Sequence, residues 1–291
     1  MTNPVLSVCI RTYNQEAFVS EALDSVLAQR TDFVFDIIVG DDCSNDGTQS
    51  ILQRYALNNA NRIRLILGEE NVGGPENLRR VIEASSAKYL AFLDGDDYYL
   101  DCYKLQKQVD FLENHPDFVS CFHNVINRYD NGGKKAELFL PLDFPSIHDC
   151  VDAISKDWFL PIHSVVLRRE YVSFPVWYNT VMNDDFVVNL SVIMHGPYYY
   201  MQDVMAVYRH HKGNVSNNYS NQILIDTQLR TILEGFKNIY PSSYKDVFDE
   251  RIRFYENRIS FNQRERREPW RKWMRLKTYK KLIKNLLFRD K

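Results

Sequence analysis

The stretch AFLDGDD, residues 91 to 97, joins three hydrophobic residues to three aspartates with one glycine among them. The apolar run indicates a buried strand, and the acids follow at its carboxyl end. Carboxylates this close raise one another's pKa unless a cation lies against them. Aspartate oxygens suit Mg2+ or Mn2+, which also take phosphate oxygens as ligands. The stretch therefore predicts a metal site for a phosphorylated substrate, although Asp97 or Asp101 could instead cap a helix that begins at Cys102.

The first hundred residues alternate between strand and helix patterns. Apolar runs of strand length occur at residues 5–13, 35–42, 62–67 and 88–94. Helical patterns lie between them, at residues 17–29, at residues 48–58 and after Gly74-Pro75. This alternation predicts an α/β fold in which helices cover both faces of a mostly parallel sheet.

Polar residues follow three of these four strands: the group Thr12-Tyr13-Asn14, the pair Asp41-Asp42, and the acids after Leu93. In open α/β sheets, ligands bind at the carboxyl edge of the strands. Ordinary loop polarity would account for any one of these endings. Three endings of this kind favour a binding site along that edge.

The remainder of the chain continues less regularly. We expect, in order, a helix at residues 102–114, a strand at 118–126, a hairpin around 131–133, a strand at 163–170, a helix at 184–194 and one or two strands at 198–211. From Gln222 the pattern is helical to the end. The break near Asn217 is the predicted domain boundary.

Composition is that of a soluble globular protein, with 291 residues, 45% apolar residues, 25% charged residues and a net charge of −2. The five cysteines are widely spaced and form no CxxC pair, which indicates reduced thiols in a cytoplasmic protein. We find no basic start followed by an apolar run, and no stretch of about 18 apolar residues. We therefore expect neither export nor a membrane span.

Six stretches resemble the family 2 glycosyltransferases with the nucleotide-sugar-binding fold called GT-A. They follow one another in the family's order from Val5 to Ser216. The stretches are SVCIRTYNQEAFVSEALDSVLAQ, IIVGDDCSNDGT, NVGGPENLRR, YLAFLDGDD, NDDFVVNLSVIMHG and VYRHHKGNVS.

The resemblance implies a GT-A nucleotide-diphospho-sugar transferase domain at residues 1–216, with a nucleotide-binding half (1–100) and an acceptor-binding half (101–216). A helical region, 217–291, follows it. The implied activity is that of an inverting, metal-dependent hexosyltransferase with Mn2+ or Mg2+ as cofactor. It would move a sugar from a nucleotide-diphosphate donor to a glycan or lipid-linked saccharide in surface polysaccharide biosynthesis.

The resemblance also assigns a set of residues to the donor nucleotide. Asp42 matches the acid that accepts a hydrogen bond from the base, and uracil offers an N–H group for it, so we expect a UDP-sugar. The segment after the third strand faces the nucleotide with a helix N-terminus, which favours anions. The Ala-Arg-Asn run of many members is missing there, and we assign no role to Arg80. The expected donor-binding residues are Thr12, Tyr13, Asn14, Glu16, Asp42, Asn71, Gly73, Asn77, Asp94 and Asp184.

Asp94 and Asp96 match the DxD pair of the fold, and the resemblance makes Asp96 a metal ligand. His211 matches a histidine near the diphosphate and the metal, and is expected as a second ligand. Asp185 matches the second acid of a Glu-Asp pair and would be the general base that takes the proton of the acceptor hydroxyl. Asp184 replaces the usual Glu. Without the other motifs, this acid pair would be read as first-turn acids at a helix N-terminus.

The C-terminal segment is basic, with twelve Lys or Arg residues and three Asp or Glu residues from Arg264 onward. Trp273, Leu276, Ile283 and Leu287 fall near one helical face, a pattern typical of a helix in a membrane interface. We therefore predict peripheral binding of residues 264–291 to the anionic cytoplasmic membrane face. The alternative is a helix docked on the catalytic domain. No RNA-binding signature is present, and no nucleic-acid partner is expected.

Two other functions remain open at this stage. A nucleotide-sugar-binding module could keep the donor pocket without turnover. A nucleotidyltransferase could share the sheet topology, but such enzymes usually have a glycine-rich, basic loop after the first strand. This chain has RTYNQEAF there, which contains no glycine.

Overall fold

The structure, a computed structural model, describes residues 3–130, 134–156, 160–213 and 222–267. The chain forms two compact units, Met1–Asn214 and Val215–Lys291, and each is treated by itself. The predicted boundary near Asn217, the predicted hairpin turn at residues 131–133 and the tail from residue 268 onward lie outside the described residues. Those predictions remain predictions.

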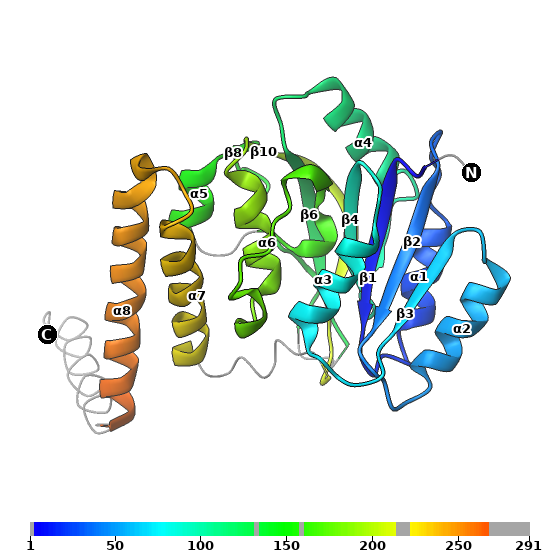
Figure 1. Cartoon of the computed structure of the whole chain (residues 1–291), viewed down its shortest axis with the longest axis horizontal. Coiled ribbons are helices and arrows are strands. Elements are labelled where there is room, and N and C mark those ends of the chain that lie inside the picture. Colours follow the sequence, from blue (N-terminus) through cyan, green and yellow to red (C-terminus); the bar gives the residue numbers. More distant parts are fainter. Residues whose placement is uncertain (1–2, 131–133, 157–159, 214–221, 268–291) are drawn as a thin grey trace, which may run out of the picture. The chain divides into compact units, whose positions relative to one another are not determined.

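Ten strands of the described residues form one sheet in the first unit, in the order β3-β2-β1-β4-β9-β6-β10-β5, with β7 beside β6 and β8 beside β10. Figure 1 labels β1 to β4, β6, β8 and β10 of this sheet. The strands are β1 (Leu6–Thr12), β2 (Phe35–Asp41), β3 (Ile63–Leu67), β4 (Tyr89–Asp94), β5 (Tyr98–Tyr99), β6 (Ser120–Tyr129), β7 (Glu137–Leu138), β8 (Ile147–His148), β9 (Val166–Arg168) and β10 (Tyr198–His210).

Helices and short 3-10 turns connect these strands. In the first unit they are α1 (Val19–Leu27), α2 (Thr48–Asn58), α3 (Gly74–Ala84), α4 (Lys104–Asn114), α5 (Cys150–Ser155), η1 (Ile162–Ser164), η2 (Arg169–Tyr171), η3 (Tyr178–Thr180) and α6 (Asp184–Ile193). The mixed α/β architecture with a central sheet confirms the predicted fold class.

Strand β1 is parallel to both of its neighbours, β2 and β4, and the register brings the polar strand ends together. Thr12 pairs with Asp41 on one side, and Arg11 pairs with Asp94 on the other. The expectation that the first strands share one carboxyl edge is therefore confirmed. Strand β9, antiparallel to both β4 and β6, joins this parallel part to the rest of the sheet.

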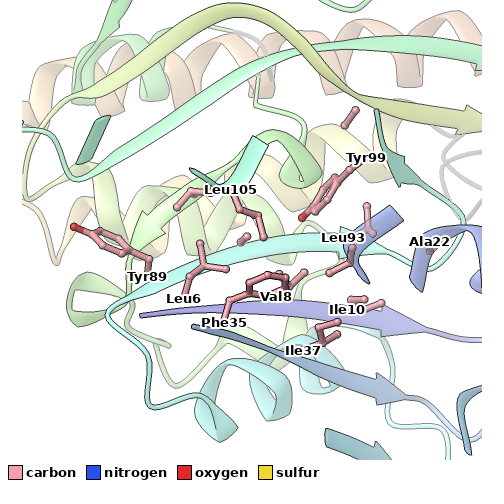
Figure 2. Close-up of a cluster of buried hydrophobic side chains, with 14 of the residues drawn as sticks. Leu6, Val8, Ile10, Ala22, Phe35, Ile37, Tyr89, Leu93, Tyr99 and Leu105 are labelled. Carbon is pink, nitrogen blue, oxygen red and sulfur yellow. The ribbon is translucent and has the colours of Figure 1, made fainter. Parts of the chain in front are cut away.

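Alternate residues of β1 face opposite sides of the sheet. Leu6, Val8 and Ile10 are fully buried in a cluster with side chains of α1, α2 and α4, part of which Figure 2 shows. Cys9 faces the other side, where its thiol lies against the carbonyl oxygen of Val81 in α3. Because side chains alternate along a strand, Arg11 points to the same side as Cys9.

One predicted strand is shorter in the structure, and the region for which one or two strands were expected forms one. The strand expected at residues 163–170 keeps only Val166–Arg168, because 3-10 turns precede and follow it. Arg168 pairs with Tyr89, the first residue of β4, so the partner strand ends there. The region 198–211 forms the single strand β10, whose register against β6 shifts twice between Met201 and Ala206.

The second unit contains α7 (Gln222–Lys237), the turn η5 (Ser242–Tyr244) and α8 (Lys245–Arg267). Asp226 of α7 is fully buried, and Arg258 of α8 contacts both of its carboxylate oxygens, at 2.5 and 2.8 Å. This pair ties the two helices to each other. Within the described part of the chain, no helix combines the length and apolarity needed to cross a membrane.

Candidate active site

The carboxyl ends of β1 and β2 are joined through one buried carboxylate. Asp41 is 1% exposed and accepts hydrogen bonds from the Thr12 hydroxyl at 2.9 Å, the Ser44 hydroxyl at 2.5 Å and the Gln49 amide at 2.8 Å. Thr12 is itself buried, whereas the neighbouring Tyr13 ring is 45% exposed. Of these two predicted donor-binding residues, Thr12 shapes the edge and Tyr13 faces solvent.

The loop after β1 is fastened to the loop after β2. The Asn14 backbone N–H donates to the Ser44 hydroxyl, and the Asn14 side-chain oxygen accepts from the Asn45 backbone. The Glu16 carboxylate accepts from the Gly47 backbone N–H at 2.6 Å. Asn14 and Glu16, both predicted to line the nucleoside pocket, therefore lie together where the two loops meet.

Asp42 positions the loop between β3 and α3. Its two carboxylate oxygens accept the backbone N–H groups of Val72 and Gly73, at 2.8 and 2.9 Å. Gly73 has a φ of 87°, a conformation that glycine adopts without strain. Asn71, which precedes Val72 in this loop, is exposed. Because each carboxylate oxygen has two lone pairs, Asp42 can still accept a further hydrogen bond.

Asn77 anchors α3 to the sheet. It is 3% exposed, and its amide donates to the carbonyl oxygen of Gly40 at 3.0 Å. The Asn77 side chain therefore contacts β2. The first turn of α3, with its free backbone N–H groups, starts at Gly74 beside the strand ends. The helix N-terminus predicted to face the nucleotide is held in place by this side chain.

Arg11 connects two acids that the sequence places 90 residues apart. Its Nε and Nη2 atoms contact the two carboxylate oxygens of Asp94, with Nη2 at 3.3 Å. Its Nη1 atom donates to Asp184 Oδ2 at 2.5 Å. A Cβ atom built on Gly74 would lie 3.8 Å from Asp184 Oδ2, so the start of α3 adjoins the same cluster. Burial alone disfavours the charged guanidinium, but Asp184 and Asp94 raise the pKa of Arg11 above its ordinary value.

Asp185 lies next to this cluster at the start of α6. One of its oxygens accepts the Phe186 backbone N–H at 2.8 Å. Burial, together with the charge of Asp184, raises the pKa of Asp185 to about 7, and Arg11 opposes that rise. A carboxyl group with this pKa is suited to accept a proton near neutral pH.

The two predicted metal ligands are in contact. His211 Nε2 lies 2.9 Å from Asp96 Oδ2, and the imidazole packs on the Phe18 ring with centroids 4.4 Å apart. Neighbouring ligands of an octahedral ion with bonds of about 2.1 Å are about 3 Å apart, so one divalent ion fits this pair. No cluster of three or more His, Cys, Asp or Glu side chains suited to a metal occurs in the described ranges. Water and phosphate oxygens would have to supply the other ligands.

Asp97 and Arg209 stabilise the acidic loop that follows β4. Asp97 is 1% exposed and accepts the Arg209 backbone N–H at 2.8 Å, and His163 Nδ1 lies 3.2 Å from its second oxygen. The Arg209 side chain donates to the backbone oxygen of Asp96 and to Glu21 at 2.5 Å. These contacts hold Asp97 within its own loop, in place of the helix cap that the sequence offered for it. The Arg209 side chain is engaged by protein groups.

The sequence matches the model of a family described as glycosyl transferase family 2 over residues 7–172, more than half of the chain. The chain belongs to glycosyl transferase family 2. An uncharacterized protein of Mycobacterium bovis is 38% identical over 208 residues, which are 71% of this chain. The family 2 chain spans about three fifths, 59%, of the length of that relative.

Another relative carries a descriptive name. The putative teichuronic acid biosynthesis glycosyltransferase TuaG of Bacillus subtilis is 30% identical over 221 residues, which are 75% of this chain and 84% of TuaG. Among solved structures, TarS of S. aureus in complex with UDP-GlcNAc superposes with a TM-score of 0.65 at 19% identity. The match covers 87% of this chain and 72% of the TarS chain, and it confirms the fold.

Sequence reasoning missed Arg11 in this family 2 site. The available signal was an arginine near the end of an otherwise apolar strand, in SVCIRTY. A charged residue in such a strand needs a buried partner, but the sequence does not indicate which acid supplies it. The structure shows that the partners are Asp94 and Asp184.

Proposed function

We propose that this chain is an inverting glycosyltransferase that uses a nucleotide-diphosphate sugar, preferably a UDP-sugar, and a divalent cation. The proposed catalytic domain is residues 1–216, with its donor half at 1–100. One observation carries the proposal: the Asp96–His211 pair and the Asp184–Asp185 pair both adjoin the strand ends, and Arg11 links Asp94 to Asp184. Family membership makes sugar transfer the chemistry to test first.

The donor nucleoside would bind over the ends of β1 and β2. Thr12, Tyr13, Asn14 and Glu16 line one side, and the unused lone pairs of Asp42 would accept the uracil N–H group. The backbone N–H groups at the start of α3 and the positive end of its dipole favour the diphosphate. This arrangement supports the donor-binding role proposed for Asn71 and Gly73, whereas Asn77 would contribute by anchoring α3 to β2.

Asp96 and His211 would hold the divalent ion, Mn2+ or Mg2+. When bound, the ion neutralises the diphosphate and makes it a better leaving group. The 2.9 Å separation of the two side-chain atoms supports this assignment. Arg209 holds Asp96 in place, because its side chain donates to the backbone oxygen of Asp96.

Asp185 would act as the general base. Inversion requires the acceptor hydroxyl to attack the anomeric carbon from the side opposite the departing diphosphate, with its proton transferred to a nearby carboxylate. A single base is sufficient, because the diphosphate leaves as an anion and needs no proton. The raised pKa of Asp185, about 7, supports its role in that transfer.

The acceptor proposed is a glycan or a lipid-linked saccharide in surface polysaccharide biosynthesis. The name of TuaG supports this class, because it refers to teichuronic acid biosynthesis. The acceptor would enter on the side of α6, where Asp185 lies in the first turn.

The decisive experiment compares the parent with Asp185→Asn in metal-dependent turnover of a panel of UDP-, GDP- and dTDP-sugars. Donor binding, measured by calorimetry with Mn2+, should persist in Asp185→Asn while turnover falls by about 100-fold or more. Asp149→Asn is the matched control, since Asp149 caps α5 with its side chain and an asparagine can do the same. Binding without turnover by the parent, across a broad acceptor screen, would instead identify a binding module.

A further inference from the structure

Arg11 is the link between the donor side and the base side of the proposed site. Its guanidinium donates to both carboxylate oxygens of Asp94 at the end of β4 and to one carboxylate oxygen of Asp184 at the start of α6. These two acids come from different halves of the domain. A planar guanidinium with several fixed donors can hold two carboxylates in a set geometry, which a lysine ammonium cannot do.

The charge of Arg11 is also distinctive in its surroundings. Asp185 is faced by Arg11 from β1, by Asp94 from β4 and by Asp184 on its own helix. Tyr178 of η3 faces the same group of charges, and Glu76 of α3 acts on Tyr178. Arg79 and Arg80 of α3 pair with Glu76. Arg11 is the cation that acts directly on Asp185, where it opposes the build-up of negative charge.

A purely structural ion pair does not explain this arrangement well. Replacing a whole buried ion pair by apolar residues of similar volume is often neutral or stabilising, whereas removing one partner alone is destabilising. Stability by itself therefore does not explain why a charged cluster occupies this place. The Arg11 side chain also keeps 21% of its surface exposed, beside Asp94 with 25%. Its position beside the proposed donor and base groups suggests a role in the reaction.

We propose that Arg11 is a positioning residue of the transfer reaction, which holds Asp184, and through it the base Asp185, at a set place relative to the donor-binding strand β4. This inference rests on the proposed function. A second consequence follows for Asp94, whose two oxygens contact Arg11 and orient the arginine.

The test uses Arg11→Met, which removes the charge at similar length, and Arg11→Lys, which keeps the charge without the fork. Arg64→Met is the matched control, because Arg64 lies in β3 and is bonded to the Ala84 carbonyl, away from the acids. Turnover is measured against pH with Mn2+, nucleotide binding by calorimetry, and folding by thermal denaturation.

Arg11→Met should lower kcat by about 100-fold, the effect of a catalytic group displaced by about 1 Å. Nucleotide binding should weaken by no more than about tenfold, because Asp94 and Asp184 lose a partner while the metal pair and Asp42 are unchanged. Its acid limb should move up by about one pH unit or more, since an opposing cation is lost. Arg11→Lys should keep the parent's acid limb with a reduced kcat. Arg64→Met should match the parent.

Three results would overturn the inference. One is an Arg11→Met enzyme whose kcat stays within about threefold of the parent value. Another is an unchanged acid limb in that variant. The third is equal loss of nucleotide binding, thermal stability and turnover in both variants, which indicates a structural role alone.

Failure of the proposed function is recognised separately, as absence of turnover by the parent with every donor. In that case the inference is decided by carbon-13 NMR of aspartate-labelled protein, with the Asp185 signal assigned from Asp185→Asn. A higher titration midpoint of Asp185 in Arg11→Met supports the link to Arg11. An unchanged midpoint overturns it.

Discussion

Two features of Asp185 decide its pH dependence: it lies beside Asp184 in the first turn of α6, and its surroundings disfavour its charge. Burial raises its pKa to about 7. A base works only when deprotonated, so kcat/KM should be level above about pH 7 and fall about tenfold per unit below it. The pH profile of kcat/KM for sugar-nucleotide turnover, recorded with Mn2+, checks this prediction. A flat profile through that region would contradict Asp185 as the base.

Asp96 permits a sharper test of the metal site. Asp96→Ala removes one of the two side chains that fit a divalent ion, so nucleotide binding should weaken about tenfold or more when Mn2+ is present. Without metal, the parent and the variant should bind nucleotide equally. Asp203→Ala, at an exposed aspartate of β10 paired with Lys107, is the control. Equal affinities in Mn2+ would reject Asp96 as a ligand.

How far single residues can be predicted depends on how local their role is. Asp96 and Asp185 were singled out because they lie in short stretches that resemble family motifs, and their roles stay predictions. Asp42 was predicted to meet the base, but its two bonds to Val72 and Gly73 depend on where the next loop lies. Arg11 was missed because its partners come from β4 and α6, far along the chain.

The contact of α3 with β2 depends on Gly40, which lies in the stretch IIVGDDCSNDGT but was given no role from the sequence. A Cβ atom on Gly40 would lie 2.4 Å from Asn77 Oδ1 and 3.2 Å from a Val81 methyl group. Gly40→Ala should therefore push α3 away from the sheet, break the Asn77 bond and lower the free energy of unfolding by about 1–3 kcal/mol. Urea denaturation measures the change.

Gly74→Ala is the matched control for this prediction. Its new Cβ would meet nothing closer than 3.8 Å, and the position is helical. Its stability should stay within about 0.5 kcal/mol of the parent. Equal stability of Gly40→Ala and Gly74→Ala would show that the packing of α3 on β2 is looser than described.

The bounds of elements with a clear sequence pattern were predicted closely. The bounds of elements whose length depends on a partner strand were not. The helix expected at residues 48–58 is α2, with the same bounds. The strand at residues 163–170 was too long, because its length is limited by where β4 begins. On α4, Lys104 is fully buried, bonded to Gln108 and 4.3 Å from the Tyr99 ring centroid. The sequence pattern alone does not reveal that Tyr99 lies beneath it.

At the scale of the molecule, the parallel half of the sheet followed from alternating strand and helix patterns. The remaining strands did not, because their order depends on pairings between distant segments. Strand β9 is inserted between β4 and β6, and β10 follows beyond β6. This arrangement carries His211, at the end of β10, back to Asp96 after β4. The proposed metal site thus depends on the topology that the sequence did not specify.

The basic C-terminal tail, which lies beyond the described residues, remains a prediction from sequence. Cations beside Trp273, Leu276 and Ile283 should hold it in the headgroup region of anionic membranes, with each lysine or arginine near the surface contributing about 1 kcal/mol. Deleting residues 270–291 should release the protein from vesicles that contain anionic lipid, as measured by co-sedimentation. Nucleotide binding by the truncated chain should match the parent, which excludes damage to the catalytic domain. Unchanged sedimentation after the deletion would favour the alternative, a tail docked on that domain.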